Sequence, residues 1–86
     1  MIGIIYSPFF VRKLNKLEKD LQEDVIQKID LFKNQKNHKM LKVHKLQGKF
    51  YGRFGFSVNY KFRIVFKYIS KNEALFLDIG DHDIYK

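Results

Sequence analysis

The 86-residue sequence contains no cysteine, which excludes disulfide frameworks, thiolate zinc sites and cysteine nucleophiles. It also lacks long apolar runs, because stretches such as Met1–Tyr6 are far too short to span a bilayer. No charged start, apolar stretch and small-residue cleavage site of a secretory signal is present. We therefore expect a cytoplasmic protein with no membrane partner, folded as a single domain over residues 1–86.

A further absence is local, since residues 31–72 contain no aspartate or glutamate but eleven lysines and arginines. The net charge of +8 is therefore concentrated: residues 1–30 balance five basic against five acidic side chains, and residues 73–86 carry four acids and one lysine. A solvated lysine-rich surface would explain this pattern. A surface that binds the phosphates of a polyanion explains it better, because the charge is confined to one half of the chain.

The first third of the chain predicts a strand followed by a helical hairpin. Ile2–Tyr6 is rich in β-branched and aromatic residues, and Ser7-Pro8 is typical of a helix start. Apolar residues then recur at helical spacing as far as Phe32. One helix over that span would exceed the diameter of so small a domain. We therefore predict helices over 8–19 and 21–35, with Asp20 and Glu23 as the capping box of the second.

The clearest periodicity lies between Phe50 and Tyr68, where even positions are apolar or aromatic and odd positions are mostly polar. Period two indicates strands, and the length requires a turn, which we place at Asn59–Lys61. A two-residue turn would exchange the two faces, so the unbroken parity predicts a three-residue or bulged connection. Residues 36–49 before this pattern are interpreted as a basic loop. A further strand over Ala74–Ile79 is expected to present Leu75, Leu77 and Ile79 on one face.

Together these elements predict an α+β fold of order β-α-α-β-β-β, with the helical hairpin on one face of a mainly antiparallel four-stranded sheet. The apolar positions then pack beneath the helices. The polar positions form an open face that carries Arg53, Lys61, Arg63 and Lys67. A cationic sheet face offers a platform for RNA or DNA.

Two of the three histidines lie where this platform could carry chemistry. His44 belongs to the basic loop, and His82 follows the last predicted strand. Imidazole titrates near neutral pH, which suits phosphodiester cleavage without a metal or other cofactor. In that reaction a base removes the 2′-hydroxyl proton and an acid protonates the departing 5′-oxygen. The residues do not show which histidine is the acid and which the base. A metal site at Asp81-His82-Asp83 is disfavoured, because so few adjacent residues rarely converge on one ion.

Three segments of the chain resemble the RelE/ParE superfamily of bacterial toxins, and within it the RelE/StbE and YafQ-like branch. They are listed in chain order as Gly48-Lys49-Phe50-Tyr51-Gly52, Phe62-Arg63-Ile64-Val65-Phe66 and Leu77-Asp78-Ile79-Gly80-Asp81-His82-Asp83-Ile84-Tyr85. The resemblance implies the toxin of a type II toxin–antitoxin pair, with a cognate antitoxin as partner. It further implies an mRNA endonuclease that acts on mRNA in the ribosome.

The resemblance also assigns residue roles. His44 matches the histidine of a His-x-Leu-x-Gly loop, and Lys45 matches a basic position in that loop. Arg63 matches the arginine that contacts the scissile phosphate, His82 the catalytic position after the last strand, and Tyr85 the C-terminal aromatic that stacks on a base. The chain departs from the YafQ-like pattern at Ser57, where a histidine is usual, and at Lys61, where an acid is usual.

The candidate site is therefore divided into two groups. The catalytic candidates are His44, Arg63, His82 and Tyr85. The RNA-binding candidates are Lys42, Lys45, Lys49, Arg53, Lys61 and Lys67. Two other functions remain open at this point: a ParE-like inhibitor that binds DNA gyrase, and an RNA-binding module without chemistry.

Overall fold

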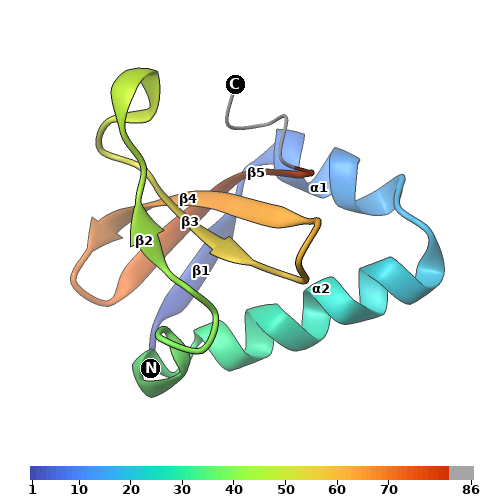
Figure 1. Ribbon diagram of the computed structural model, residues 1–86, viewed down its shortest axis with the longest axis horizontal. Coiled ribbons are helices and arrows are strands. Elements are labelled where there is room, and N and C mark those ends of the chain that lie inside the picture. The colour runs from blue at the N-terminus through green and yellow to red at the C-terminus, as the bar shows by residue number, and fades with distance from the viewer. Residues whose placement is uncertain (82–86) are drawn as a thin grey trace.

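The computed structural model describes residues 1–81 of the chain (Figure 1). The regular elements follow one another as β1 (Gly3–Tyr6), α1 (Pro8–Asn15), α2 (Lys19–Phe32), β2 (His44–Lys45), β3 (Phe54–Ser57), β4 (Arg63–Ser70) and β5 (Glu73–Gly80). Two short 3₁₀ turns, Gln35–Asn37 and Gly48–Phe50, lie before and after β2.

The strands form one sheet in the order β1-β5-β4-β3-β2. β1 runs parallel to β5, and every other neighbouring pair is antiparallel. Both helices lie on the same side of the sheet, so the opposite side is left without a covering helix (Figure 1). The α+β architecture predicted from the sequence is confirmed. The sheet has five strands, not four, because His44–Lys45 leaves the predicted loop to pair with β3.

Helix α1 begins as the sequence predicts. The Ser7 hydroxyl accepts a hydrogen bond from the Phe10 backbone N–H at 3.0 Å, and Pro8 occupies the first helical position, where no N–H is needed. The helix ends at Asn15, four residues before the predicted boundary. The Gln22 side chain closes the corner between the helices by donating to the Leu14 carbonyl at 2.9 Å.

The predicted capping box of the second helix is wrong. The residue at the N-cap of α2 is Glu18, whose side chain makes no capping hydrogen bond, and Asp20 lies inside the first turn. There its carboxylate faces the positive end of the helix dipole, which is favourable without a cap. The helix ends at Phe32, before the predicted boundary at 35. Neither described helix is long and apolar enough to cross a membrane.

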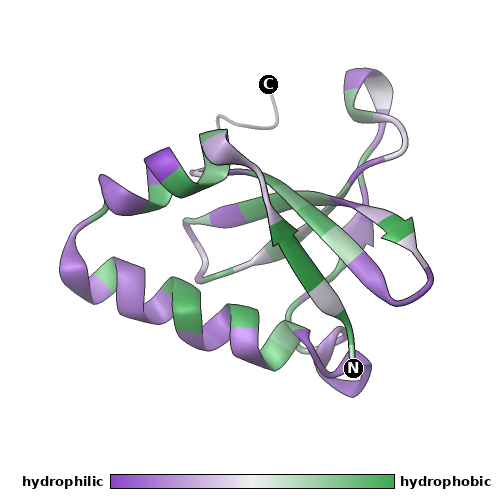
Figure 2. Ribbon diagram, turned by 180° about the vertical axis from the view of Figure 1, so that it is seen from behind, coloured by the Kyte–Doolittle hydropathy of each residue, from purple (hydrophilic) through white to green (hydrophobic). Residues whose placement is uncertain are grey.

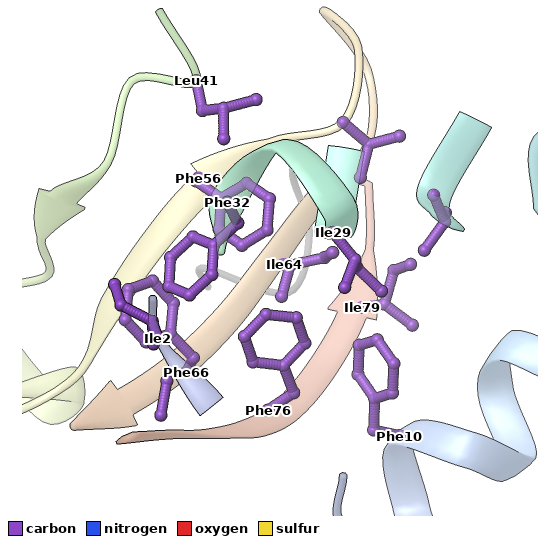
Figure 3. Packing of buried hydrophobic residues seen from close by; sticks show 13 residues of the cluster. Ile2, Phe10, Ile29, Phe32, Leu41, Phe56, Ile64, Phe66, Phe76 and Ile79 are labelled. Carbon is purple, nitrogen blue, oxygen red and sulfur yellow. The ribbon is translucent and has the colours of Figure 1, made fainter. Parts of the chain in front are cut away.

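The core lies between α2 and the sheet and is built around aromatic rings (Figure 3). Phe32 is fully buried, and its ring centroid lies 4.9 Å from that of Phe56, 4.9 Å from that of Phe66 and 5.3 Å from that of Phe76. Such offset and edge-to-face contacts add to the free energy gained by burying apolar area. Figure 2 shows the apolar residues of α2 alternating with polar ones along the helix.

The connection between β3 and β4 has the predicted length. Val58 donates to the Phe62 carbonyl at 2.9 Å, which leaves Asn59, Tyr60 and Lys61 as a three-residue loop. The register pairs Phe56 with Ile64, so the apolar parity continues through the turn. The alternation that separates the two faces of this hairpin is therefore confirmed.

The predicted facing of β5 is wrong in part. The register shifts by one residue between Val65–Asp78 and Phe66–Phe76, so that Leu77 is the extra residue of a β-bulge. Ala74 and Phe76 are buried in the core, and the bulge returns Ile79 to the same side. Leu75 and Leu77 are only partly buried and do not join the core cluster.

Candidate nucleic-acid interface

The sheet face opposite the helices is defined by residues that pair across four strands. One row contains His44 of β2, Gly55 of β3, Val65 of β4 and Asp78 of β5, as consecutive register partners. Directly opposed residues project to the same side of a sheet. Because Phe56 and Ile64, one position along, are core residues, this row faces away from the helices. We call this side of the sheet the open face.

A second row of the open face contains Ser57, Arg63 and Gly80. His44 and Arg63 stand two strands apart and two residues along, so their Cα atoms are separated by about 12 Å at ordinary sheet spacings. Two side chains of that length can approach a single phosphodiester group from opposite sides. Gly55 of β3, the strand that separates β2 from β4, adds no side chain between His44 and Arg63.

The His44 ring is oriented by the turn that precedes β2. Nδ1 lies 2.7 Å from the Lys42 carbonyl oxygen. A carbonyl only accepts hydrogen bonds, so Nδ1 carries the proton, and in the neutral ring Nε2 carries the lone pair. This arrangement fixes one tautomer and one ring orientation, as expected for an imidazole that takes up a proton.

The turn that supplies this carbonyl is strained. Lys42 has φ 61°, the left-handed conformation in which glycine is normally found. The Val43 N–H bonds the His38 carbonyl at 3.0 Å and the Lys42 N–H bonds the Lys39 carbonyl at 3.1 Å, which is the Schellman pattern that ends a helical turn. The strain therefore lies at the residue that orients His44.

Arg63 is held by the β3–β4 loop. Its Nη1 donates to the Asn59 carbonyl at 2.7 Å and to the Phe62 carbonyl at 3.2 Å. Guanidinium has five N–H donors, and among residues 1–81 no acceptor engages the other three. A fixed guanidinium with three donors left over is suited to bind a phosphate.

Asn59 shapes that loop, although the sequence indicated only a turn there. Its Oδ1 accepts from the Lys61 N–H at 2.8 Å and the Phe62 N–H at 2.7 Å. These two bonds form an Asx-type turn, and they place the Asn59 carbonyl within reach of Arg63. An asparagine at the start of the predicted turn was the available signal.

The structure distributes the other predicted cations around the open face. Arg53 precedes β3 and Lys67 follows Phe66 in β4, so alternation places both on the open face. Lys61 lies in the β3–β4 loop and not on the strand face where the sequence placed it. Lys49 stacks on Phe50 with its ammonium 5.5 Å from the ring centroid.

Lys45 and Asp78 complete the charge distribution. Lys45 pairs with Phe54, so it projects to the other side of the edge strand from His44. Asp78 places a carboxylate on the open face, and Lys13 of α1 pairs with it at 2.6 Å. This ion pair keeps that carboxylate from opposing an anionic ligand. His82 and Tyr85, the remaining catalytic candidates, lie outside the described residues.

Neither a family model nor a curated protein matches the sequence at a significant level. Solved structures do match the fold over nearly the whole chain. The toxin–antitoxin complex RelBE2 from Mycobacterium tuberculosis matches with a TM-score of 0.71 at 13% identity, covering 94% of this chain and 98% of that one. This chain has the RelE-like toxin fold.

Two further neighbours support the same fold. The YoeB–YefM complex from Staphylococcus aureus matches with a TM-score of 0.72 at 15% identity, covering 95% of this chain and 98% of the other. The H87Q mutant of YafQ from Escherichia coli matches with a TM-score of 0.70 at 21% identity, covering 98% and 97%. The resemblance found in the sequence therefore agrees with the three-dimensional neighbours, which are toxins of the RelE/ParE superfamily.

Proposed function

We propose that this protein is the toxin of a type II toxin–antitoxin pair and that it cleaves mRNA by metal-independent attack of the 2′-hydroxyl. The observation that carries the proposal is the pair of oriented groups on the open face. His44 is held in one tautomer by the Lys42 carbonyl, and Arg63 is held by the Asn59 carbonyl, about 12 Å from it in a neighbouring row. The structural neighbours, which are toxins and toxin–antitoxin complexes, support the same function.

In the proposed reaction His44 acts as the general base. Its Nε2 takes the proton of the 2′-hydroxyl, and the 2′-oxygen forms a bond to the adjacent phosphorus. The Arg63 guanidinium stabilises the additional negative charge of the pentavalent transition state. The bond to the 5′-oxygen then breaks, and an acid protonates that oxygen. The products are a 2′,3′-cyclic phosphate and a free 5′-hydroxyl.

His82 and Tyr85 enter this proposal from the sequence resemblance alone. We assign His82 to the protonation of the 5′-oxygen and Tyr85 to stacking on a substrate base. Lys42, Lys49, Arg53, Lys61 and Lys67 are assigned to the RNA backbone. Lys45, which projects to the other side of β2 from His44, is assigned to it from the sequence resemblance alone. Phosphate contacts of this kind set the position of the strand and weaken as the salt concentration rises.

The proposed partners are mRNA, the ribosome and a cognate antitoxin. Neighbours from Mycobacterium tuberculosis and Staphylococcus aureus are toxin–antitoxin complexes. An antitoxin that covers the open face with an acidic or apolar segment would neutralise the charge on which RNA binding depends.

The test is to express the wild-type protein and His44→Ala separately in bacterial cells and to map the 5′ ends of the mRNA. The wild type is expected to create new ends that carry a 5′-hydroxyl. Loss of a general base typically costs a factor of about 10² to 10⁴, so His44→Ala should lose most of these ends. Lys19→Ala, which removes a charge far from the open face, is the control and should cleave normally.

Three results would contradict the proposal. Intact mRNA combined with arrested DNA replication would indicate a gyrase inhibitor. RNA binding without new ends would indicate a module that lacks chemistry. Full cleavage by His44→Ala would show that His44 is not the general base.

Arg63→Ala and Arg63→Lys, each checked by thermal unfolding, separate phosphate binding from support of the loop, because lysine retains the charge but not the bidentate fork.

A further inference from the structure

A cationic cleft lies at the edge of the open face, next to the β3–β4 loop. It has a volume of about 350 Å³ and lies between the end of β3, the strained turn before β2 and helix α2. Its lining includes Arg63, Lys42 and Lys28, and no acidic side chain from the described part of the chain lines it. The three cations come from β4, a turn and α2, so only the fold brings them together.

Lys28 is the residue that the sequence did not single out. It belongs to α2, where acidic side chains outnumber basic ones and the local net charge is negative. Its ammonium makes no ion pair with any of residues 1–81, although Asp24 stands one helical turn before it. Its side chain is half-buried in the wall of the cleft. Lys28 thus contributes a positive charge to a site that otherwise belongs to residues 31–72.

Apart from Ser57 and Asn59, the other residues that line the cleft are apolar or aromatic. Tyr60, at the tip of the β3–β4 loop, is 88% exposed, and Met40, which also lines the cleft, is 61% exposed. A large exposed aromatic ring beside several cations is the combination used by proteins that stack single-stranded bases while binding the backbone. An inorganic anion would engage the cations alone and would make no use of the ring.

We propose that this cleft is a nucleotide subsite for single-stranded RNA. It would hold the nucleotide next to the scissile bond, with Lys28 and Lys42 on its phosphate and Tyr60 stacked on its base. Arg63 borders both the open face and the cleft, so one strand can pass from His44 into the subsite. This inference rests on the proposed function for its substrate, but Lys28 and Tyr60, the residues that test it, lie outside the catalytic pair of His44 and Arg63.

The experiment measures binding and cleavage separately. A fluorescent single-stranded oligoribonucleotide of about ten nucleotides, with the attacking 2′-hydroxyl replaced by a methoxy group, reports binding without cleavage. Lys28→Ala is expected to weaken binding about five-fold or more at low salt. Lys19→Ala removes the same charge from the same helix, outside the cleft, and should change binding less than two-fold.

Tyr60 supplies the test of stacking. Stacking of one base contributes about 1–3 kcal/mol, so Tyr60→Ala should weaken binding at least five-fold, whereas Tyr60→Phe should retain most of the affinity. Both variants should keep the wild-type unfolding temperature, because the ring is exposed. Cleavage of an unmodified oligonucleotide by Lys28→Ala should show a raised KM with little change in kcat.

The outcomes distinguish the two proposals. If the wild-type protein binds the oligonucleotide but never cleaves RNA, the proposed function fails and the subsite is still judged by the binding data. If the wild type cleaves and Lys28→Ala and Tyr60→Ala bind as tightly as Lys19→Ala, the subsite is refuted while the nuclease stands. If Lys28→Ala weakens the binding of inorganic phosphate as much as that of the oligonucleotide, and Tyr60→Ala does not change oligonucleotide binding, the cleft is an anion site. That result would overturn the nucleotide proposal.

Discussion

The two sides of the sheet differ in almost every physical property. The helix side is an aromatic core in which Phe32, Phe56, Phe66 and Phe76 are fully buried, and no charged side chain of residues 1–81 is buried there. The open face carries cations, glycines, an oriented histidine and a strained turn. Alternation along the same strands produces both, because consecutive residues point to opposite sides. Stability and the proposed function are therefore encoded at alternate positions of one sequence.

The largest expected effect comes from breaking the helix side. Phe32→Ala removes the ring that contacts three other core phenylalanines, and a large-to-small change at such a site costs about 3–5 kcal/mol. Urea unfolding should show a midpoint shifted to much lower concentration with a similar slope. An exposed ring of the open side provides the control, since Tyr60→Ala should leave the midpoint within error. A loss below about 1 kcal/mol for Phe32→Ala would contradict the packing described above.

A smaller change in the free energy of unfolding, of opposite sign, is expected from a substitution on the open side. Lys42 holds a left-handed conformation that costs a non-glycine residue about 1 kcal/mol. Lys42→Gly should therefore raise the free energy of unfolding by up to about 1 kcal/mol, which corresponds to several degrees in the unfolding temperature of a domain this size. The same change removes a cation from the cleft, so RNA affinity should fall while stability rises.

Lys42→Asn separates the two contributions, because asparagine tolerates the left-handed region but has no charge. It should match Lys42→Gly in RNA affinity and exceed the wild type slightly in stability. Neither variant should alter the nitrogen chemical shifts that report the His44 tautomer, because the carbonyl that orients the ring is retained. A destabilised Lys42→Gly would show that the lysine side chain supports the turn.

What the sequence could predict follows the strength of its periodic patterns. The parity that continues from Phe56 through Val58 to Phe62 predicted both the loop length and the two faces, because a shift of one residue would expose the core. Ser7-Pro8 predicted the start of α1 through chemistry that is entirely local. These features depend on neighbours in the chain, so one sequence was enough to find them.

The features that the sequence did not reveal depend on contacts between distant residues. The bulge at Leu77 has no glycine or proline to mark it, and it returns Ile79 to the core only because β5 pairs with β4. The two-residue strand His44–Lys45 is too short to have a period, and its pairing with β3 decides the direction of His44. Lys28 looks like any surface lysine of α2 until the fold places it beside Arg63. The site is thus harder to predict than the core.

The smallest expected effect concerns the ion pair that connects the two sides. Lys13 of α1 pairs with Asp78 of the open face at 2.6 Å, and both side chains are about one-third exposed at 35% and 29%. Such a pair contributes less than about 1 kcal/mol to stability, so Lys13→Ala should change the unfolding temperature only slightly.

Lys13→Ala would, however, leave the Asp78 carboxylate on the open face without its cation. RNA affinity should fall about two-fold at low salt, and this difference should shrink as salt is added. Lys16→Ala, which removes an equal charge from the end of the same helix, should have a weaker effect. If the two variants bind RNA equally well, Asp78 does not face the bound strand, and the RNA-binding surface does not include the β5 side of the open face.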